Sequence, residues 1–372
     1  MNQNSSLLSR RDFQKLLTVG LAAATFPAVV LTEAAAKEPA KVKPIRLHFN
    51  ENPAGLSPSA RVALDELLEL AWQYPDQSRG MFHTDLATLH GIARDRILLG
   101  NGSSEPLALA AQTFSGPDRP LVTADPTYDG VAEYAGPFNT EVKKTPLGKG
   151  YSHDLGRMVE AVGKAGLLYI CNPNNPTGTI TPKADVRNAI GAVPNDVTIV
   201  VDEAYHHYVV SDDYESVIPM IEDHANLVVL RTFSKIYGMA GLRCGYAIAQ
   251  PETLGRMRER QARNNLNIAA LLAARASLGD LAWVEESKKR NNATRSKLMK
   301  ELEKMGYGCT PSQASFLMIN LKTNTRPLAK AMKERGILVG RPFPPMTDFL
   351  RLSIGTPSQM DRFLDEFGKM TT

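Results

Sequence analysis

The stretch Val197-Thr198-Ile199-Val200-Val201-Asp202-Glu203-Ala204-Tyr205 decides the fold. A short apolar run that ends directly in polar residues is typical of a strand in a parallel sheet covered on both faces. The run ends at Asp202, so the pattern predicts a carboxylate at the mouth of that sheet. An alternative remains open, because Asp is also a favoured residue at the start of a helix.

The same pattern recurs on both sides of this stretch. Six apolar runs alternate with helical segments: Ile97–Leu99, Leu121–Val122, Leu167–Ile170, Val197–Val201, Leu227–Leu230 and Gly245–Ala249. This alternation predicts an α/β fold whose large domain has a mostly parallel sheet. Five of the runs lead directly into residues that could carry chemistry. Because open α/β sheets bind ligands beyond the carboxyl ends of their strands, these loops should converge on one crevice.

The pattern of predicted helices and strands changes after Pro251. Helices are predicted over Glu252–Ala262, Ile268–Leu278, Leu281–Met305 and Ala329–Arg335, and strands over Phe316–Leu321 and Phe349–Ile354. We therefore expect a smaller α+β domain. The predicted boundaries are 37–74 for an N-terminal arm joining the small domain, 75–265 for the large domain, and 266–372 for an interdomain helix and the small C-terminal domain.

The first 36 residues are predicted to be a targeting segment outside the fold. The pair Arg10-Arg11 precedes an uncharged stretch, Leu16–Thr32, and the small residues Ala34–Ala36 suit cleavage after Ala36. The paired arginines resemble the twin-arginine export motif, which implies a periplasmic protein. An amphipathic surface helix or a membrane anchor is the alternative. An anchor would need about 20 predominantly apolar residues, and Pro27 interrupts this stretch, so no stable anchor is expected.

Composition excludes several classes of function. The chain has 372 residues and a formal net charge of +4, with acidic and basic residues interspersed, so no nucleic-acid partner is expected. Its length suits two domains that share a cleft. Cys171, Cys244 and Cys309 lack the spacing of a zinc site or a disulfide framework, so they are interpreted as buried apolar residues and no metal is predicted.

Two further loops carry polar residues at strand ends. Leu167–Cys171 leads into a rigid turn with two prolines and a glycine, from which Asn175 projects. Leu227–Leu230 leads into Arg231-Thr232-Phe233-Ser234-Lys235, and Arg243 follows eight residues later. These loops should therefore bring together, at one edge of the sheet, one carboxylate, one amide, one phenol, one lysine and one arginine.

These motifs resemble those of fold-type I pyridoxal-phosphate enzymes, specifically class II aminotransferases close to histidinol-phosphate aminotransferases. The motifs in family order are Asn50-Glu51-Asn52-Pro53, Tyr74-Pro75-Asp76, Gly100–Glu105, Pro126-Thr127-Tyr128, Asn174–Gly178, Asp202–Tyr205, Ser234-Lys235, Gly241–Tyr246 and Leu350–Thr356. The resemblance covers nearly the whole chain after the targeting segment. Each motif alone is weak, but together, in order and at fitting spacing, they are specific.

The resemblance implies a role for each residue around the cofactor. Lys235 forms an imine with the cofactor and moves the proton at the substrate Cα. Asp202 pairs with the protonated pyridine nitrogen, Asn175 and Tyr205 donate to the phenolic oxygen, and Tyr128 stacks on the ring. A lone lysine is more often a solvated surface residue, and a lone tyrosine is as often a core residue, so both alternatives stay open.

The resemblance also implies how the phosphate and the substrate are held. The phosphate is expected at the start of a helix over Glu105–Gln112, against Gly102, Ser103, Ser104, Thr232, Ser234, Arg243 and Tyr74, the last from the partner subunit of a homodimer. Arg351, Arg341 and Asn52 are expected to bind substrate. The loop around Arg341 is spaced differently from the family pattern. His206 and His207 could line the pocket or pack in the core or at the surface.

The predicted activity is transfer of an amino group from an L-amino donor to a 2-oxo acid such as 2-oxoglutarate. The donor is expected to be histidinol-phosphate-like or an aromatic amino acid. Histidinol phosphate is a cytoplasmic intermediate, so export argues for a paralogue that acts on another amino donor, aromatic or imidazole-bearing. Two alternatives are a decarboxylase of the same fold and a ligand-binding relative without turnover. The intact lysine, carboxylate, tyrosine and arginine argue against the second.

Overall fold

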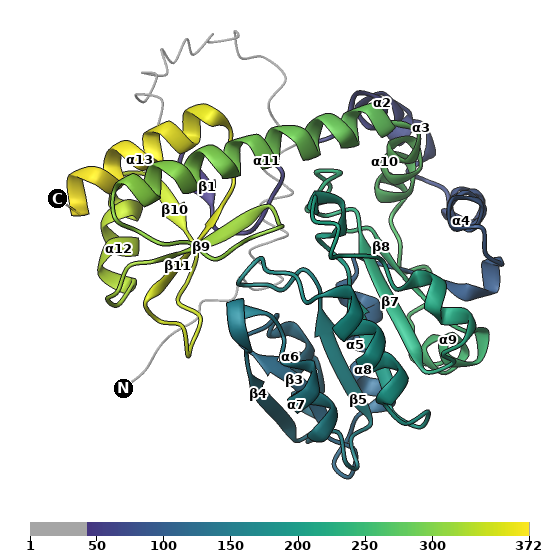
Figure 1. Cartoon of the computed structure of the whole chain (residues 1–372). Helices are drawn as coiled ribbons and strands as arrows, with labels where there is room; N and C mark the ends of the chain where they lie inside the picture. The colour runs from purple at the N-terminus through teal and green to yellow at the C-terminus, as the bar shows by residue number, and fades with distance from the viewer. Residues whose placement is uncertain (1–42, 372) are drawn as a thin grey trace, which may run out of the picture. The chain divides into compact units, whose positions relative to one another are not determined.

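A computed structural model describes residues 43–371 (Figure 1). The predicted targeting segment, with Arg10, Arg11 and the cleavage point after Ala36, lies outside the described residues, as do residues 37–42 of the predicted arm. In the described part of the chain, no helix is long and apolar enough to cross a membrane.

The large sheet has seven strands in the order β2-β8-β7-β6-β5-β3-β4. Their bounds are β2 Ile97–Gly100, β3 Leu121–Asp125, β4 Val142–Pro146, β5 Leu167–Cys171, β6 Thr198–Asp202, β7 Leu227–Thr232 and β8 Gly245–Ile248. Strands β4, β3, β5, β6 and β7 pair in parallel, and β8 runs antiparallel to both of its neighbours. The predicted mostly parallel α/β sheet is therefore confirmed.

Helices cover both faces of this sheet (Figure 1). Along β5 and β6, alternate residues belong to two separate apolar clusters, as the two-residue period of a strand requires. One cluster packs under α5 (Ser104–Phe114), α6 (Gly130–Ala135) and α9 (Pro251–Arg258). The other packs under α4 (Asp76–His90), α7 (Leu155–Glu160), α8 (Lys183–Ala192) and α10 (Ile268–Gly279).

The C-terminal part contains a second, smaller core. Its elements are α11 (Leu281–Lys304), β9 (Phe316–Asn320), α12 (Arg326–Glu334), β10 (Ile337–Val339), β11 (Phe349–Ser353) and α13 (Pro357–Thr371). Strands β9 and β11 pair antiparallel, as an α+β domain allows. Helix α12 begins three residues before the predicted start, because Pro327 is well tolerated in a first helical turn.

The N-terminal arm is divided between the two cores. Strand β1 (Ile45–Leu47) pairs in parallel with β10, so this end of the arm joins the small domain. The next elements, α2 (Pro58–Ala63) and α3 (Leu67–Leu70), instead contact α10, and the Ser59 hydroxyl donates to Asp280 at 2.5 Å. The predicted arm over 37–74 therefore does not join the small domain along its whole length.

Candidate active site

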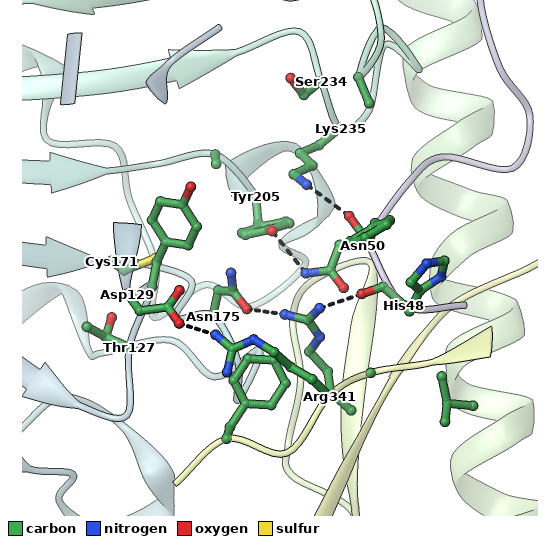
Figure 2. A pocket seen from close by; sticks show the side chains of 18 of the residues that line it. His48, Asn50, Thr127, Asp129, Cys171, Asn175, Tyr205, Ser234, Lys235 and Arg341 are labelled. Atoms are coloured by element: carbon green, nitrogen blue, oxygen red, sulfur yellow. Dashed lines mark hydrogen bonds and ion pairs between the residues drawn. The ribbon is translucent and has the colours of Figure 1, made fainter. Parts of the chain in front are cut away.

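A cavity of about 920 Å³ lies beyond the carboxyl ends of β5, β6 and β7 (Figure 2). Its sheet side carries Asn175, Asp202, Tyr205 and Lys235, and its small-domain side carries Arg341 and Arg351. This volume is typical of a site for a small molecule and a cofactor together. The strand-end loops thus converge on one crevice, as their positions in the sequence predict.

Lys235 lies in the turn after β7 and opens into the cavity. Its Nζ donates to the carbonyl oxygen of Phe49 at 3.3 Å and lies 5.4 Å from the centre of the Tyr205 ring. Burial, aided by the positive charges of Arg351 and Arg243, lowers the pKa of Lys235 from 10.5 to about 8, while Asp202 opposes the shift. A larger fraction of this amine than of an ordinary lysine is therefore unprotonated near neutral pH, and a lysine that attacks a carbonyl must be unprotonated.

This lowered pKa predicts how the protein takes up a pyridine aldehyde. Only the unprotonated amine reacts, so the uptake rate of the cofactor-free protein should rise with pH, reach half of its maximum near pH 8 and then level off. Rapid-mixing absorbance measurements between pH 6 and pH 11 would show the midpoint. A rate that still climbs steeply near pH 10.5 would mean that Lys235 keeps an ordinary pKa.

Asp202 ends strand β6 and is buried. Its Oδ2 accepts from the Tyr169 hydroxyl at 2.9 Å, and its Oδ1 accepts from the Ala204 N–H at 3.0 Å. Burial raises the pKa of Asp202, and these two donors together with Lys235 oppose that rise. The next element is the short 3-10 helix His206–Tyr208, which begins after Tyr205, so Asp202 does not cap a helix. Its carboxylate instead faces the cavity, where a cationic ring nitrogen would compensate its charge.

Asn175 and Tyr205 lie on the same wall (Figure 2). The side-chain oxygen of Asn175 accepts from Arg351 at 2.7 Å, and the Tyr205 hydroxyl accepts from the Asn50 amide at 3.1 Å. Asn50 was missed from sequence, although it belongs to the same motif as Asn52. Its left-handed backbone, with φ of 57°, accompanies the inward direction of its side chain.

Asn52 does not line the active-site cavity, which corrects its predicted place in the substrate site. Its amide donates to the Ile236 carbonyl at 2.7 Å, next to Lys235 in the chain. Because side chains two residues apart leave a turn in different directions, the motif alone could not separate the two asparagines. In this structure Asn52 holds the lysine-bearing turn.

Hydroxyl groups and a guanidinium surround the predicted phosphate position. Arg243 donates to the Ser234 hydroxyl at 3.1 Å and to the Ser104 hydroxyl at 3.4 Å. Ser103, Ser104, Thr232 and Ser234 line the cavity. A Cβ at Gly102, whose φ is +75°, would lie 2.2 Å from the Arg243 guanidinium, so this close approach requires glycine. Helix α5 opens here, one residue earlier than predicted.

This donor set fits a phosphorylated pyridine aldehyde. The first turn of α5, the hydroxyls and Arg243 suit the phosphate, Lys235 suits the aldehyde, and Asp202 suits the ring nitrogen. Tyr128 lines the cavity and also packs against the apolar cluster under α5, so it is at once a wall residue and a core residue. A Cβ at Gly130 would lie 2.6 Å from the Tyr128 ring.

Arg351 lies in strand β11 and is buried at the small-domain side of the cavity. One terminal nitrogen donates to Asn175, the other donates to the His48 carbonyl at 2.6 Å, and Nε has no partner among the described residues. Burial lowers the pKa of Arg351 to about 10. Arg341 reaches the same cavity from the loop after β10 and forms an ion pair with Asp129.

Other expected residues lie elsewhere. His206 and His207 do not line the cavity: His206 contacts Arg231, which pairs with buried Glu203 at 2.6 Å, and His207 lies 3.3 Å from the Tyr237 hydroxyl. Cys244 is buried away from the cavity, whereas Cys171 is buried and lines it. Cys309 is only partly buried and forms an isolated β-bridge with Ile319. Tyr74 is 78% exposed and does not line the cavity of its own chain.

The sequence and the fold are similar to those of known proteins. The sequence model described as "Aminotransferase class I and II" matches residues 42–367. A histidinol-phosphate aminotransferase of Moorella thermoacetica is 36% identical over 324 residues, which cover 86% of this chain and 83% of that protein.

Two crystal structures have the same fold. A protein of Erwinia carotovora atroseptica matches with a TM-score of 0.85 and 35% identity, over 88% of this chain and 97% of that one. The histidinol-phosphate aminotransferase of Sinorhizobium meliloti, in complex with pyridoxal-5'-phosphate, matches with a TM-score of 0.83 and 25% identity, over 88% and 91%. The chain therefore belongs to the aminotransferase class I and II family and is a pyridoxal-phosphate-dependent aminotransferase.

Proposed function

We propose that the enzyme moves an amino group from an L-amino donor, histidinol-phosphate-like or aromatic, to a 2-oxo acid such as 2-oxoglutarate. The observation that carries this proposal is the placement of Lys235 and Arg351 around one cavity. Pyridoxal phosphate supplies a ring that accepts the electron pair left when the Cα proton is removed. The chain supplies Lys235 as the base for that proton and Arg351 as the partner of the substrate's anionic group, a carboxylate or a phosphate.

The cavity wall supports a donor with a flat side chain. Phe49, Tyr128 and Phe343 line it together with His48. Aromatic walls bind flat rings through apolar contact and edge or stacking geometry. The named relatives act on histidinol phosphate according to their names, which fits a donor with an imidazole ring.

A screen of amino donors on the purified, cofactor-loaded protein would test this function. Each donor would be mixed with enzyme in the absence of acceptor. The cofactor absorbance and the released oxo product would be measured, a 2-oxo acid from an amino acid and a ketone phosphate from histidinol phosphate. Histidinol phosphate and aromatic amino acids are expected to give the fastest half-reactions. Release of carbon dioxide without a 2-oxo acid would instead identify a decarboxylase.

We also propose that the protein is exported to the periplasm through the twin-arginine pathway. The support is the Arg10-Arg11 pair before an uncharged stretch that ends at Ala34–Ala36. Buried Cys171 and Cys244 and the partly exposed Cys309 are all free thiols, so the described fold contains no disulfide. Such a fold can be completed in the cytoplasm before export.

Replacement of both Arg10 and Arg11 by lysine should therefore retain the folded enzyme in the cytoplasm. Lysine keeps the charge but removes the planar guanidinium, so a change in location would report recognition of the arginine pair. Cell fractionation with an activity assay is the measurement. Undiminished export of the double variant would contradict the twin-arginine assignment.

We further propose a homodimer in which Tyr74 binds the cofactor phosphate in the partner's cavity. Tyr74 is exposed, and so are Leu68 at 84% and Trp72 at 82%, on the segment from α3 to α4. Exposed apolar side chains gathered on one segment are typical of an interaction surface. Two-fold dimers place the same surface on both subunits, so each could complete the other's site.

Mixed dimers would test this sharing. Lys235→Ala subunits and Tyr74→Ala subunits should each have low activity, the second because a hydrogen bond to a charged group contributes roughly 1.5 to 3 kcal/mol. If Tyr74 acts across the interface, each mixed dimer contains one site with both residues intact, and activity should rise after subunit exchange. No recovery, with exchange shown by mass spectrometry, would place Tyr74 within its own subunit.

A further inference from the structure

An ion pair spans the mouth of the cavity between two distant parts of the chain. Arg341 comes from the loop after β10, and Asp129 precedes α6 at the edge of the large sheet (Figure 2). Asp129 stands at the N-cap position of α6, yet its side chain makes no capping hydrogen bond. Its carboxylate is therefore committed to Arg341 and not to the helix.

Arg341 also lies close to the arginine expected to bind the substrate carboxylate. The guanidinium carbon of Arg341 lies 4.3 Å from the centre of the Phe343 ring, and the guanidinium carbon of Arg351 lies 4.6 Å from the same centre. The two guanidinium carbons are thus at most about 9 Å apart, the sum of these two distances. A short dicarboxylate could contact both arginines at once, one carboxylate at each.

The surrounding charge favours such an anion. The carboxylates that line the cavity are Asp129 and Asp202, and Asp202 faces the lysine side. Along one side of α12, Arg326, Lys330 and Lys333 line the outer part, and none pairs with a carboxylate in the described part of the chain. Asp129 therefore supplies a negative charge at the mouth of the cavity, where the other charged side chains are positive.

We propose that Asp129 is a specificity-determining residue that competes with the acceptor for Arg341. When the occupant has an uncharged far end, Asp129 keeps Arg341 paired. When a dicarboxylic 2-oxo acid enters, one carboxylate lies at Arg351 and the other replaces Asp129 at Arg341. Both members of the pair are about half exposed, so its disruption costs little. The proposal rests on the transaminase function above, because it explains how one cavity accepts two unlike substrates.

Binding without turnover would test this competition. Glutarate and pentanoate have the same carbon chain but two and one carboxylates, and calorimetry on the cofactor-loaded protein would give both dissociation constants. In Asp129→Asn, the Kd for glutarate should fall about two- to fivefold, the value of an exposed ion pair, while the Kd for pentanoate stays unchanged. Glu133→Gln is the matched control, since Glu133 is exposed, lies one turn further along α6 and does not line the cavity.

Variants that lack Arg341 distinguish competition for this arginine from a general effect of removing a negative charge. In Arg341→Met, glutarate should lose its advantage over pentanoate, and adding Asp129→Asn should bring no further gain. The proposal is overturned if wild-type protein binds glutarate no better than pentanoate, or if Asp129→Asn leaves glutarate binding unchanged or weaker. It is also overturned if the gain persists without Arg341 or appears equally in Glu133→Gln. All of these measurements are of binding and require no product formation. A failed donor screen would therefore reject the proposed function, whereas the role of Asp129 would still be decided by the binding constants.

Discussion

Replacement of Lys235 by alanine is expected to lower kcat by about 10⁴-fold, the upper part of the range for loss of a positioned acid–base group. Lys235 is also the cavity lysine whose pKa is lowered to about 8, so no other group could replace both the covalent bond to the cofactor and the proton transfer proposed for it. Half-reactions followed by cofactor absorbance would measure the loss.

Two controls make this result specific. Lys164→Ala removes an exposed lysine outside the cavity and should leave kcat unchanged. Borohydride reduction of the wild-type protein should fix the cofactor to the peptide that contains Lys235, and mass spectrometry would locate it. A reduced adduct on a different lysine would refute the assignment regardless of the kinetics.

Replacement of Asp202 by asparagine is expected to lower kcat by about 10² to 10³-fold, as for loss of one preorganised electrostatic partner. The amide keeps the size and shape of the side chain but removes the charge that would hold the ring nitrogen protonated. Steady-state kinetics with a saturating donor would measure kcat, and thermal unfolding would show whether the variant is folded.

Tyr169→Phe is the matched control for Asp202. It removes the 2.9 Å donor to the carboxylate but leaves the charge in place, so its effect on kcat should be smaller than that of Asp202→Asn. Equal losses in the two variants would mean that Asp202 acts by ordering the end of β6, and the charge would then have no separate role.

The strands of the large sheet could be predicted because their apolar runs are continuous and end in polar loops. The edge strand β4, Val142–Pro146, was not among the predicted strands, because two of its five residues are lysines, as is common at a sheet edge. Strand β10 has three residues and exists through its pairing with β1, nearly 300 residues earlier. A pattern among neighbouring residues cannot reveal a partner strand that lies so far away in the sequence.

The sequence by itself determined the family, the α/β architecture and the set of chemical groups at the strand ends, because strand periodicity and the motifs are local properties of the chain. Only the tertiary structure decided which asparagine faces the cavity, that Arg341 pairs with Asp129, and that burial lowers the pKa of Lys235. Side-chain direction, ion pairing and desolvation depend on atoms supplied by distant segments. Those atoms come together only when the arm, the large sheet and the small domain pack around one cavity.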